Sequence, residues 1–250
     1  MTRRIFVLTG AGISAESGLG TFRDKGGEGI WARFDPMRLA TPEAFACDPD
    51  TVLAFYDARR RNLLAAAPNA AHFALARLEA ALASAGGELA LVTQNVDDLH
   101  ERAGSRRVLH MHGELLKARC VDCESVRAWT GDLLRCEPCP ACGGGLRPHV
   151  VWFGEMPFHK EEIELALERA DLFVAIGTSG AVYPAAGFAA EARALGIPTL
   201  EINLEAADNA ELFDDSRYGP ASAAVPAWVD DVTARLTSPA RPCGQKTKPG

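Results

Sequence analysis

The chain has 250 residues, of which 48% are hydrophobic and 24% charged, a composition typical of a globular protein rather than a disordered or collagen-like one. Lys and Arg number 26 against 33 Asp and Glu, so the formal net charge of -7 excludes the basic character of a nucleic-acid binder. The longest uncharged run, Leu172–Ala190, contains glycines and a proline, which favour a strand, loop and helix over a membrane span. We expect a cytoplasmic protein with no nucleic-acid or membrane partner, and we favour a monomer.

Short apolar runs and helical periodicity alternate along the first part of the chain. Ile5–Leu8 predicts a buried strand that ends at Gly10, and the Gly-rich stretch from Gly18 to Pro42 is irregular. The pattern then predicts helices at Pro49–Ala66 and Ala70–Ala85, a strand at Leu89–Thr93, a helix at Val96–Ala103 and a strand at Val108–Met111.

The alternation resumes after residues 113–148, a segment rich in Gly, Pro and charge that is typical of an insertion. The pattern predicts helices at Glu161–Arg169, Pro184–Leu195 and Ala223–Leu236, and strands at Leu172–Ile176 and Thr199–Ile202. Residues 238–250 lack apolar periodicity and are predicted to be disordered. Strands that alternate with helices predict an α/β fold with a mainly parallel, Rossmann-like sheet interrupted by insertions.

Two glycine-containing turns directly follow predicted strands. The first, Gly10-Ala11-Gly12-Ile13-Ser14-Ala15, fits the pattern in which glycines let backbone N–H groups approach a pyrophosphate, although a tight turn without a ligand explains it equally well. The loop after Gly18, with Phe22-Arg23-Asp24, departs from a dehydrogenase pattern. The second turn, Gly177-Thr178-Ser179, precedes a strand that ends in the polar run Glu201–Glu205, which suits recognition of an adenosine ribose. Together the two turns favour a dinucleotide site.

Polar residues also follow the predicted strand Leu89–Thr93, in the order Gln94-Asn95-Val96-Asp97. At the carboxyl edge of a parallel sheet, such residues point into the ligand crevice. The alternative is helix capping, with Asn95 as the N-cap and Asp97 in the first turn. The residues alone leave both explanations open.

Five of the seven cysteines fall between Cys120 and Cys142, and this clustering indicates a metal site rather than a disulfide framework. Cys120, Cys123, Cys139 and Cys142 form two CxxC pairs, which can place four thiolates around a structural zinc ion. Cys136 competes, since it forms a further CxxC pair with Cys139. We favour Cys139 and Cys142 as ligands, because the glycines after Cys142 supply the tight turn that a zinc knuckle needs.

Two histidines stand near the end of a predicted strand, in the run His110-Met111-His112. Strand alternation would place both side chains on the same face. His112 precedes Gly113, where the chain can turn into the insertion, so His112 is the stronger candidate for a cleft residue. A histidine with an ordinary structural or surface role is the alternative.

Together, these motifs resemble the sirtuin family of NAD-dependent protein lysine deacylases. The shared segments, in family order from residue 4 to about 236, are the run from Gly10 to Gly18, Thr21-Phe22-Arg23, Thr93 to Asp97, His112-Gly113, the CxxC pairs, Arg147 to Glu155 and Gly177-Thr178-Ser179. The resemblance implies an NAD-binding domain at residues 1–30, 86–112 and 150–237. A helical module at 31–85 and a zinc-binding module at 113–149 would form a smaller lobe.

The resemblance also implies the role of each site residue, with NAD lying between the two lobes. His112 would be the general base, and Asn95 and Asp97 would complete the catalytic set. Acyl-lysine would lie against Val151, Phe153 and Gly154, and the products would be nicotinamide, 2′-O-acyl-ADP-ribose and free lysine. The residues that would contact NAD are Gly10, Ala11, Gly12, Ser14, Phe22, Arg23, Gln94, Asn95, Val96, Asp97, Gly177, Thr178, Ser179, Asn203, Leu204, Glu205 and Ala221.

Tyr56 and Arg59 are three residues apart in a helical pattern and therefore share one helix face. An amphipathic helix with a solvated arginine explains them from the residues alone. The run also resembles the Tyr-x-x-Arg pattern of class III sirtuins, whose two side chains grip the carboxylate of succinyl-, malonyl- or glutaryl-lysine. A guanidinium offers a carboxylate two parallel hydrogen bonds, and a phenol adds a further donor. We therefore expect succinyl and malonyl groups to be preferred, with acetyl groups also accepted.

Three other classes of protein use parts of the same pattern. A mono-ADP-ribosyltransferase would use the same NAD site and the same His112, and is the main alternative. The loop after Gly18 disfavours an NAD(P) dehydrogenase. The combination of Asn95, Asp97 and His112 disfavours a module that binds zinc and a nucleotide without catalysis.

Overall fold

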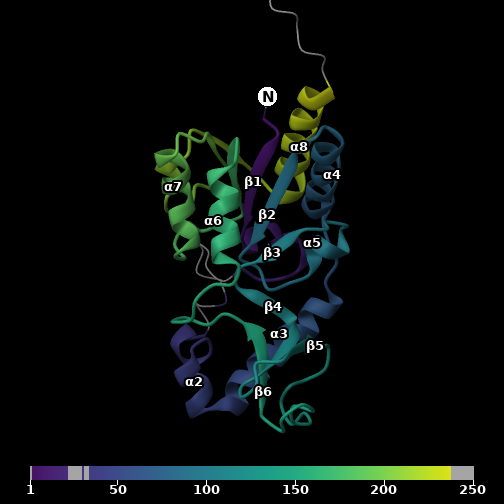
Figure 1. The fold of residues 1–250 in the computed structure, drawn as a ribbon, viewed down its shortest axis with the longest axis vertical. Coiled ribbons are helices and arrows are strands. Elements are labelled where there is room, and N and C mark those ends of the chain that lie inside the picture. The colour runs from purple at the N-terminus through teal and green to yellow at the C-terminus, as the bar shows by residue number, and fades with distance from the viewer. Residues whose placement is uncertain (1, 22–29, 31–33, 238–250) are drawn as a thin grey trace, which may run out of the picture.

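The computed structural model describes residues 2–21, 30 and 34–237. The predicted cofactor residues Phe22 and Arg23, and the tail 238–250 that was predicted to be disordered, lie outside the described residues. The described chain forms an elongated molecule with a six-stranded sheet in one part and a three-stranded sheet in the other (Figure 1).

The six-stranded sheet has the order β3-β2-β1-β7-β8-β9, and every neighbouring pair in it is parallel. The chain adds strands to one side of β1 and then to the other, so the strand order reverses at β1. A parallel sheet opens a ligand crevice at such a point, beyond the carboxyl ends of its strands. The strands are β1 (Arg4–Thr9), β2 (Glu88–Thr93), β3 (Val108–His110), β7 (Leu172–Ile176), β8 (Thr199–Asn203) and β9 (Asp215–Tyr218).

Helices cover both faces of this sheet, and the alternation of side chains along β1 shows why its run is apolar throughout. Ile5 and Val7 pack with helices α4 and α8 on one face, whereas Phe6 and Leu8 pack with α6 and α7 on the other. The predicted Rossmann-like α/β fold is therefore confirmed. The helices are α4 (Ala70–Ser84), α6 (Lys160–Glu168), α7 (Phe188–Ala194) and α8 (Ala221–Thr237).

The three-stranded sheet is antiparallel, in the order β5-β4-β6, and packs with helices α2 and α3 to form the part that we call the small lobe. It lies below the parallel sheet in Figure 1. The domain limits given above stay predictions. The elements of the small lobe are α2 (Pro42–Cys47), α3 (Pro49–Ala65), β4 (Gly113–Cys120), β5 (Val126–Ala128) and β6 (Leu146–Val150).

Single helical turns connect several of these elements. The turns are the helix α5 (Leu99–Arg102) and the 3-10 turns η1 (Ala11–Ile13), η2 (Ala15–Ser17), η3 (Pro36–Arg38), η4 (Ala185–Gly187) and η5 (Ala210–Leu212). None of the helices in the described part of the chain combines the length and the apolar character that a membrane crossing requires.

The predicted helix Val96–Ala103 is wrong in its first half, because only α5 is helical. Asn95 does not cap it. Its side-chain amide instead donates hydrogen bonds to the carbonyl of Gly10 (3.1 Å) and to Oγ of Ser14 (3.2 Å). These contacts to the first glycine turn hold residues 94–97 outside a helix, so the capping alternative is excluded.

Other predicted elements differ at their ends. The strand expected at Val108–Met111 stops at His110, so strand alternation does not extend to His112 and the expected common face loses its basis. The helix expected at Pro184–Leu195 is divided into η4 and α7. Short or polar elements escaped prediction altogether, namely α2, the edge strand β9 and the strands β4, β5 and β6. These last three strands lie in or beside residues 113–148, which we call the cysteine segment.

Candidate active site

A cleft of about 890 Å³ lies beyond the carboxyl ends of β1, β2, β7 and β8 and extends to the small lobe. It holds every described residue that was predicted for catalysis, NAD or acyl-lysine except Ser14 and Asp97. We call the side formed by Gly10–Gly12, Gln94–Val96, His112 and Gly177–Ser179 the sheet wall. The side formed by Tyr56, Arg59 and residues 150–155 is the lobe wall. Asn203, Leu204, Glu205 and Ala221 line one end of the cleft.

Ser14 and Asp97 lie in a smaller pocket of about 80 Å³. This pocket shares Ala11, Arg59, Asn95 and Val96 with the cleft, so the two spaces adjoin. The structure thus brings every described residue predicted for catalysis, NAD or acyl-lysine to one continuous region.

The two glycine turns pack directly on each other, and this packing explains their glycines. A Cβ on Gly12 would lie 2.7 Å from Cα of Gly177, and a Cβ on Gly10 would lie 2.7 Å from the carbonyl oxygen of Gly177. Gly177 also has a φ of 62°, which side-chain-bearing residues rarely adopt. The glycines therefore let the turns meet, in addition to leaving the backbone open toward the cleft.

A saturated hydrogen-bond network lies beside the smaller pocket. Oγ of Ser14 donates to Oδ2 of Asp97 (3.0 Å) and accepts from the amide of Asn95 (3.2 Å). Burial lowers the pKa of His72 to about 4, so this imidazole is neutral, and its Nδ1 accepts from the backbone N–H of Asn69. Its Nε2–H is therefore the donor to Oγ of Ser14 (3.4 Å).

His72 is the member of this network that sequence reasoning missed. It sits in the first turn of α4, where its pairing with Asn69 forms a capping box. That local pattern gives a sufficient structural reason for the histidine, and the contact to Ser14 spans 58 residues. Burial raises the pKa of Asp97, against the hydrogen bonds from Leu99 and Ser14 that lower it.

His112 has a neutral imidazole whose orientation is fixed by a hydrogen bond. Its Nδ1 lies 3.1 Å from the carbonyl oxygen of Gln94, which can only accept, so Nδ1 carries the hydrogen and Nε2 keeps its lone pair. Burial lowers the pKa of His112 below 6.5, and the imidazole is therefore neutral at pH 7. His110 differs, because its Nε2 bonds Glu101 at 2.7 Å and it does not line the cleft.

Tyr56 and Arg59 stand together on the lobe wall, as the shared helix face predicted. The guanidinium of Arg59 lies 5.6 Å from the ring centre of Phe55 and 5.7 Å from that of Tyr56. Burial lowers the pKa of Arg59, but a guanidinium remains charged at any pH that the protein survives. The Tyr56 oxygen accepts a hydrogen bond from the indole nitrogen of Trp152 at 3.0 Å.

Asp57 and Arg60, which directly follow Tyr56 and Arg59, fasten α3 to the cysteine segment. Asp57 accepts hydrogen bonds from the backbone N–H groups of Leu133 and Leu134, both at 2.9 Å, and pairs with Arg60. The carboxylate and the guanidinium are almost completely buried, and Arg60 also donates to the carbonyl of Leu115 at 3.0 Å. One turn of helix thus faces the cleft with Tyr56 and Arg59 and holds the small lobe with Asp57 and Arg60.

The segment after β6 contributes the rest of the lobe wall. The backbone N–H of Val151 donates to the carbonyl of His112, and that of Phe153 donates to the carbonyl of Ala40, both at 2.9 Å. These two N–H groups are therefore engaged within the protein.

Four cysteine sulfurs lie together at the end of the small lobe. The Sγ atoms of Cys120, Cys123, Cys139 and Cys142 are all within 4.8 Å of one another. Cys120 and Cys142 are 3.4 Å apart, and Cys123 and Cys139 are 3.7 Å apart. Zn–S bonds of about 2.3 Å in a tetrahedron place the sulfurs about 3.8 Å apart, so this set fits a structural zinc ion.

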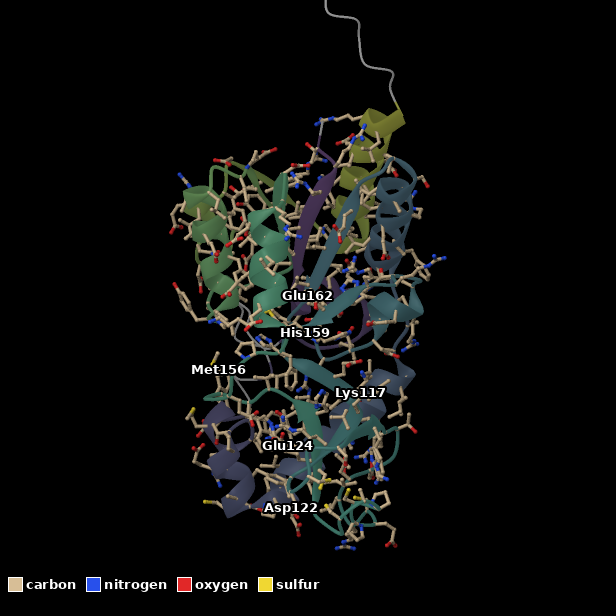
Figure 2. All side chains as sticks on the ribbon, viewed as in Figure 1. Lys117, Asp122, Glu124, Met156, His159 and Glu162 are labelled. Carbon is tan, nitrogen blue, oxygen red and sulfur yellow. The ribbon has the colours of Figure 1, made fainter. Side chains whose placement is uncertain are left out.

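Cys136 is outside this cluster and packs with the apolar residues of the small lobe. The alternative ligand set that includes Cys136 is thereby excluded. Asp122 and Glu124, which flank Cys123, lie far below the parallel sheet in Figure 2. The metal site is therefore remote from the cleft.

Comparison with known proteins agrees with this geometry. The model of the Sir2 family matches residues 10–184. An NAD-dependent protein deacylase of Caulobacter vibrioides is 63% identical over 235 residues, which cover 93% of this chain and 98% of the relative. A Sir2 homologue mutant in complex with ADP-ribose superimposes with a TM-score of 0.85 at 39% identity, with 95% and 94% of the two chains covered. Another, in complex with 2′-O-acetyl-ADP-ribose, has a TM-score of 0.82 at 40% identity, with 94% and 93% covered. The resemblance found in the sequence is confirmed, and the chain belongs to the Sir2 family.

Proposed function

We propose that this protein is an NAD-dependent protein-lysine deacylase that prefers succinyl and malonyl groups over acetyl groups. The observation that carries the acyl preference is the position of Tyr56 and Arg59, which line the same cleft as His112. The name of the Caulobacter relative and the ligands of the two Sir2 structures support NAD dependence and deacylation.

The residues present fit NAD. The cleft volume lies within the range of about 300–1,000 Å³ that ligand pockets occupy, and the packed glycine turns leave bare backbone on its sheet wall. When bound, NAD would supply the ribose that receives the acyl group. Gly10–Gly12 and Gly177–Ser179 would contact its phosphates, and Gln94, Asn95 and Asp97 would surround its nicotinamide.

The far end of the cleft would hold the adenosine half. Glu205 and Leu204 are exposed there and free to turn toward a ribose or a purine. Asn203 is more constrained, since its amide donates to the carbonyl of Thr178 at 2.8 Å and its oxygen accepts from the N–H of Leu204. We therefore assign Asn203 mainly to joining the two loops that would receive adenosine.

His112 would act as the general base. Its neutral form is secured by burial, and its Nε2 is the nitrogen available to take a proton from a ribose hydroxyl. The carbonyl of Gln94 would stabilise the imidazolium that results, because it accepts the hydrogen on Nδ1.

Tyr56 and Arg59 would select the acyl group. A carboxylate at the end of a succinyl or malonyl chain can accept two hydrogen bonds from the guanidinium and one from the phenol. Hydrogen bonds to charged groups contribute about 1.5–3 kcal/mol. An acetyl group has no carboxylate and receives none of this stabilisation.

The test is a panel of peptides that differ only in the acyl group on one lysine. Release of nicotinamide gives kcat/KM for succinyl, malonyl and acetyl peptides with NAD. We expect the acidic acyl groups to exceed acetyl by about tenfold or more, and a preference for acetyl overturns the proposal. Nicotinamide release that needs no acyl peptide, with ADP-ribose transferred to protein, identifies the mono-ADP-ribosyltransferase instead.

A reducing compartment such as the cytoplasm suits this function. The four-cysteine set binds zinc only as thiolates, which oxidation to disulfides would remove. The proposed partners are the acylated lysine side chains of other proteins. A monomeric state stays a prediction, which light scattering can check.

A further inference from the structure

We propose that Trp152 is a specificity-positioning residue, whose indole N–H fixes the Tyr56 hydroxyl as a hydrogen-bond donor toward the carboxylate of an acidic acyl group. The inference deepens the proposed function and rests on it. It begins from a contact between residues 96 positions apart, on two different elements of the lobe wall.

The direction of this hydrogen bond follows from the chemistry of its partners. Nε1 of Trp152 lies 3.0 Å from the Tyr56 oxygen, and an indole N–H can only donate. The phenol oxygen must therefore accept, so its own hydrogen is directed to another acceptor. Burial raises the pKa of Tyr56, and the phenol keeps that hydrogen throughout the neutral range. Tyr56 therefore offers a donor, which is what a carboxylate requires.

The indole itself has little freedom to turn. Trp152 is only 2% exposed, and the guanidinium of Arg147 lies 3.3 Å from its ring centre. Phe45 packs with a ring-centre distance of 5.2 Å. Glu155 accepts a hydrogen bond from the backbone N–H of Trp152 at 2.8 Å and holds Arg147 with two more, at 2.6 and 2.9 Å. Both the ring and the backbone of Trp152 are thus held in place.

The contacts between Arg147 and Glu155 also offset the negative charge on the lobe wall. Glu155 lines the cleft, where a free carboxylate would repel an acidic acyl group. Its paired hydrogen bonds with Arg147, and the guanidinium of Arg119 at 3.4 Å, offset that charge. Residues 147–155 therefore orient the donor and remove a repulsion at the same time.

The sharpest test replaces Trp152 with benzothienylalanine, which exchanges the indole N–H for sulfur at nearly the same volume. We expect KM for a succinyl peptide to rise by about threefold to tenfold, the range of one ordinary hydrogen bond. The kcat for that peptide should change less than its KM, and the ratio of succinyl to acetyl kcat/KM should fall by about threefold to tenfold, since acetyl offers no partner to the phenol. Trp152→Phe is the simpler variant, and it retains an aromatic ring against Arg147.

Two controls separate positioning from a general structural role. In a Tyr56→Phe background, the change at Trp152 should leave the ratio of succinyl to acetyl kcat/KM unaltered. Trp228→Phe removes a tryptophan that is equally buried but lies in α8, within the core of the parallel sheet, and should not change the ratio either. Equal losses for both acyl groups, or a full effect of the Trp152 change without the Tyr56 hydroxyl, overturn the proposal.

The wild-type protein keeps this test distinct from that of the proposed function. Wild type that prefers acetyl refutes the acidic-acyl preference, and the role of Trp152 with it. Wild type that prefers succinyl, with an unchanged ratio after the N–H is removed, refutes the role of Trp152 alone.

Discussion

The sheet wall and the lobe wall of the cleft hold their side chains by different means. On the sheet wall, the loop groups follow directly after β1, β2 and β7, and His112 comes two residues after β3. Backbone contacts such as Gly12 N–H to Gly177 carbonyl (2.9 Å) fix the glycine turns. On the lobe wall, Tyr56 and Arg59 lie in the middle of α3, and side-chain contacts to Trp152 and to the cysteine segment position them.

We infer from this difference that the two walls serve different parts of the reaction. A cofactor common to every substrate would be contacted by backbone and by His112, whose place is set by the parallel sheet. The acyl group, which varies, would be contacted by side chains that a few substitutions can change. Substitutions of the acyl-selecting side chains on the lobe wall should therefore change the preference among acyl groups. Substitutions on the sheet wall should lower turnover of every acyl peptide alike.

The largest effect is expected where the lobe wall loses its support. Cys139→Ser removes one of four clustered thiolates, and zinc should be lost with unfolding of the small lobe, because structural zinc contributes on the order of 10 kcal/mol to small zinc modules. Zinc content and circular dichroism measure this change. Cys136→Ser is the matched control and should retain zinc. Full zinc content after Cys139→Ser contradicts the assigned ligand set.

On the sheet wall, His112→Ala should lower turnover of every acyl peptide alike, by about 100- to 10,000-fold, since general bases contribute about this much. Binding of NAD, measured by calorimetry, should remain within a few fold of wild type. His159→Ala is the control, because His159 is half exposed at the start of α6 and does not line the cleft (Figure 2). Retained turnover removes His112 from the catalytic set.

The double change Tyr56→Phe and Arg59→Met should separate the two walls. We expect kcat/KM for succinyl peptides to fall by about tenfold to hundredfold, the range of a hydrogen bond to a charged group. The value for acetyl peptides should stay within a few fold of wild type. Steady-state rates on both peptides measure the ratio, and a parallel fall for both assigns the pair a structural role.

The smallest effect concerns pH. Because burial lowers the pKa of His112 below 6.5, its neutral, basic form persists to lower pH than an exposed imidazole would allow. The kcat/KM for an acyl peptide should therefore be level above pH 7 and fall only as the pH drops below 6.5. A profile that falls already between pH 8 and 7 would assign the base to another group or to a solvated histidine.

Sequence alone predicts the sheet wall better than the lobe wall, for a physical reason. The groups of the sheet wall are local to strand ends, where apolar runs and glycines are visible in the chain. Asn95 shows the limit, since its role as a helix cap could be excluded only when its contact to Gly10 was known.

The contacts that orient the side chains of the site join residues far apart in the sequence. Tyr56 meets Trp152 across 96 positions, Asp57 meets Leu133 across 76, and Ser14 meets His72 across 58. No periodicity in one sequence carries such pairings. The resemblance to sirtuins indicated which residues matter, but the partners that orient them required the fold.

The close packing of the two glycine turns limits when the first turn can fold during synthesis of the chain. Gly10 and Gly12 leave the ribosome before Gly177, which forms the surface against which they fit. The first turn therefore cannot reach its final form on a nascent chain until β7 and the turn after it have emerged. A cofactor could then assist only the last stage of folding, after most of the parallel sheet is in place.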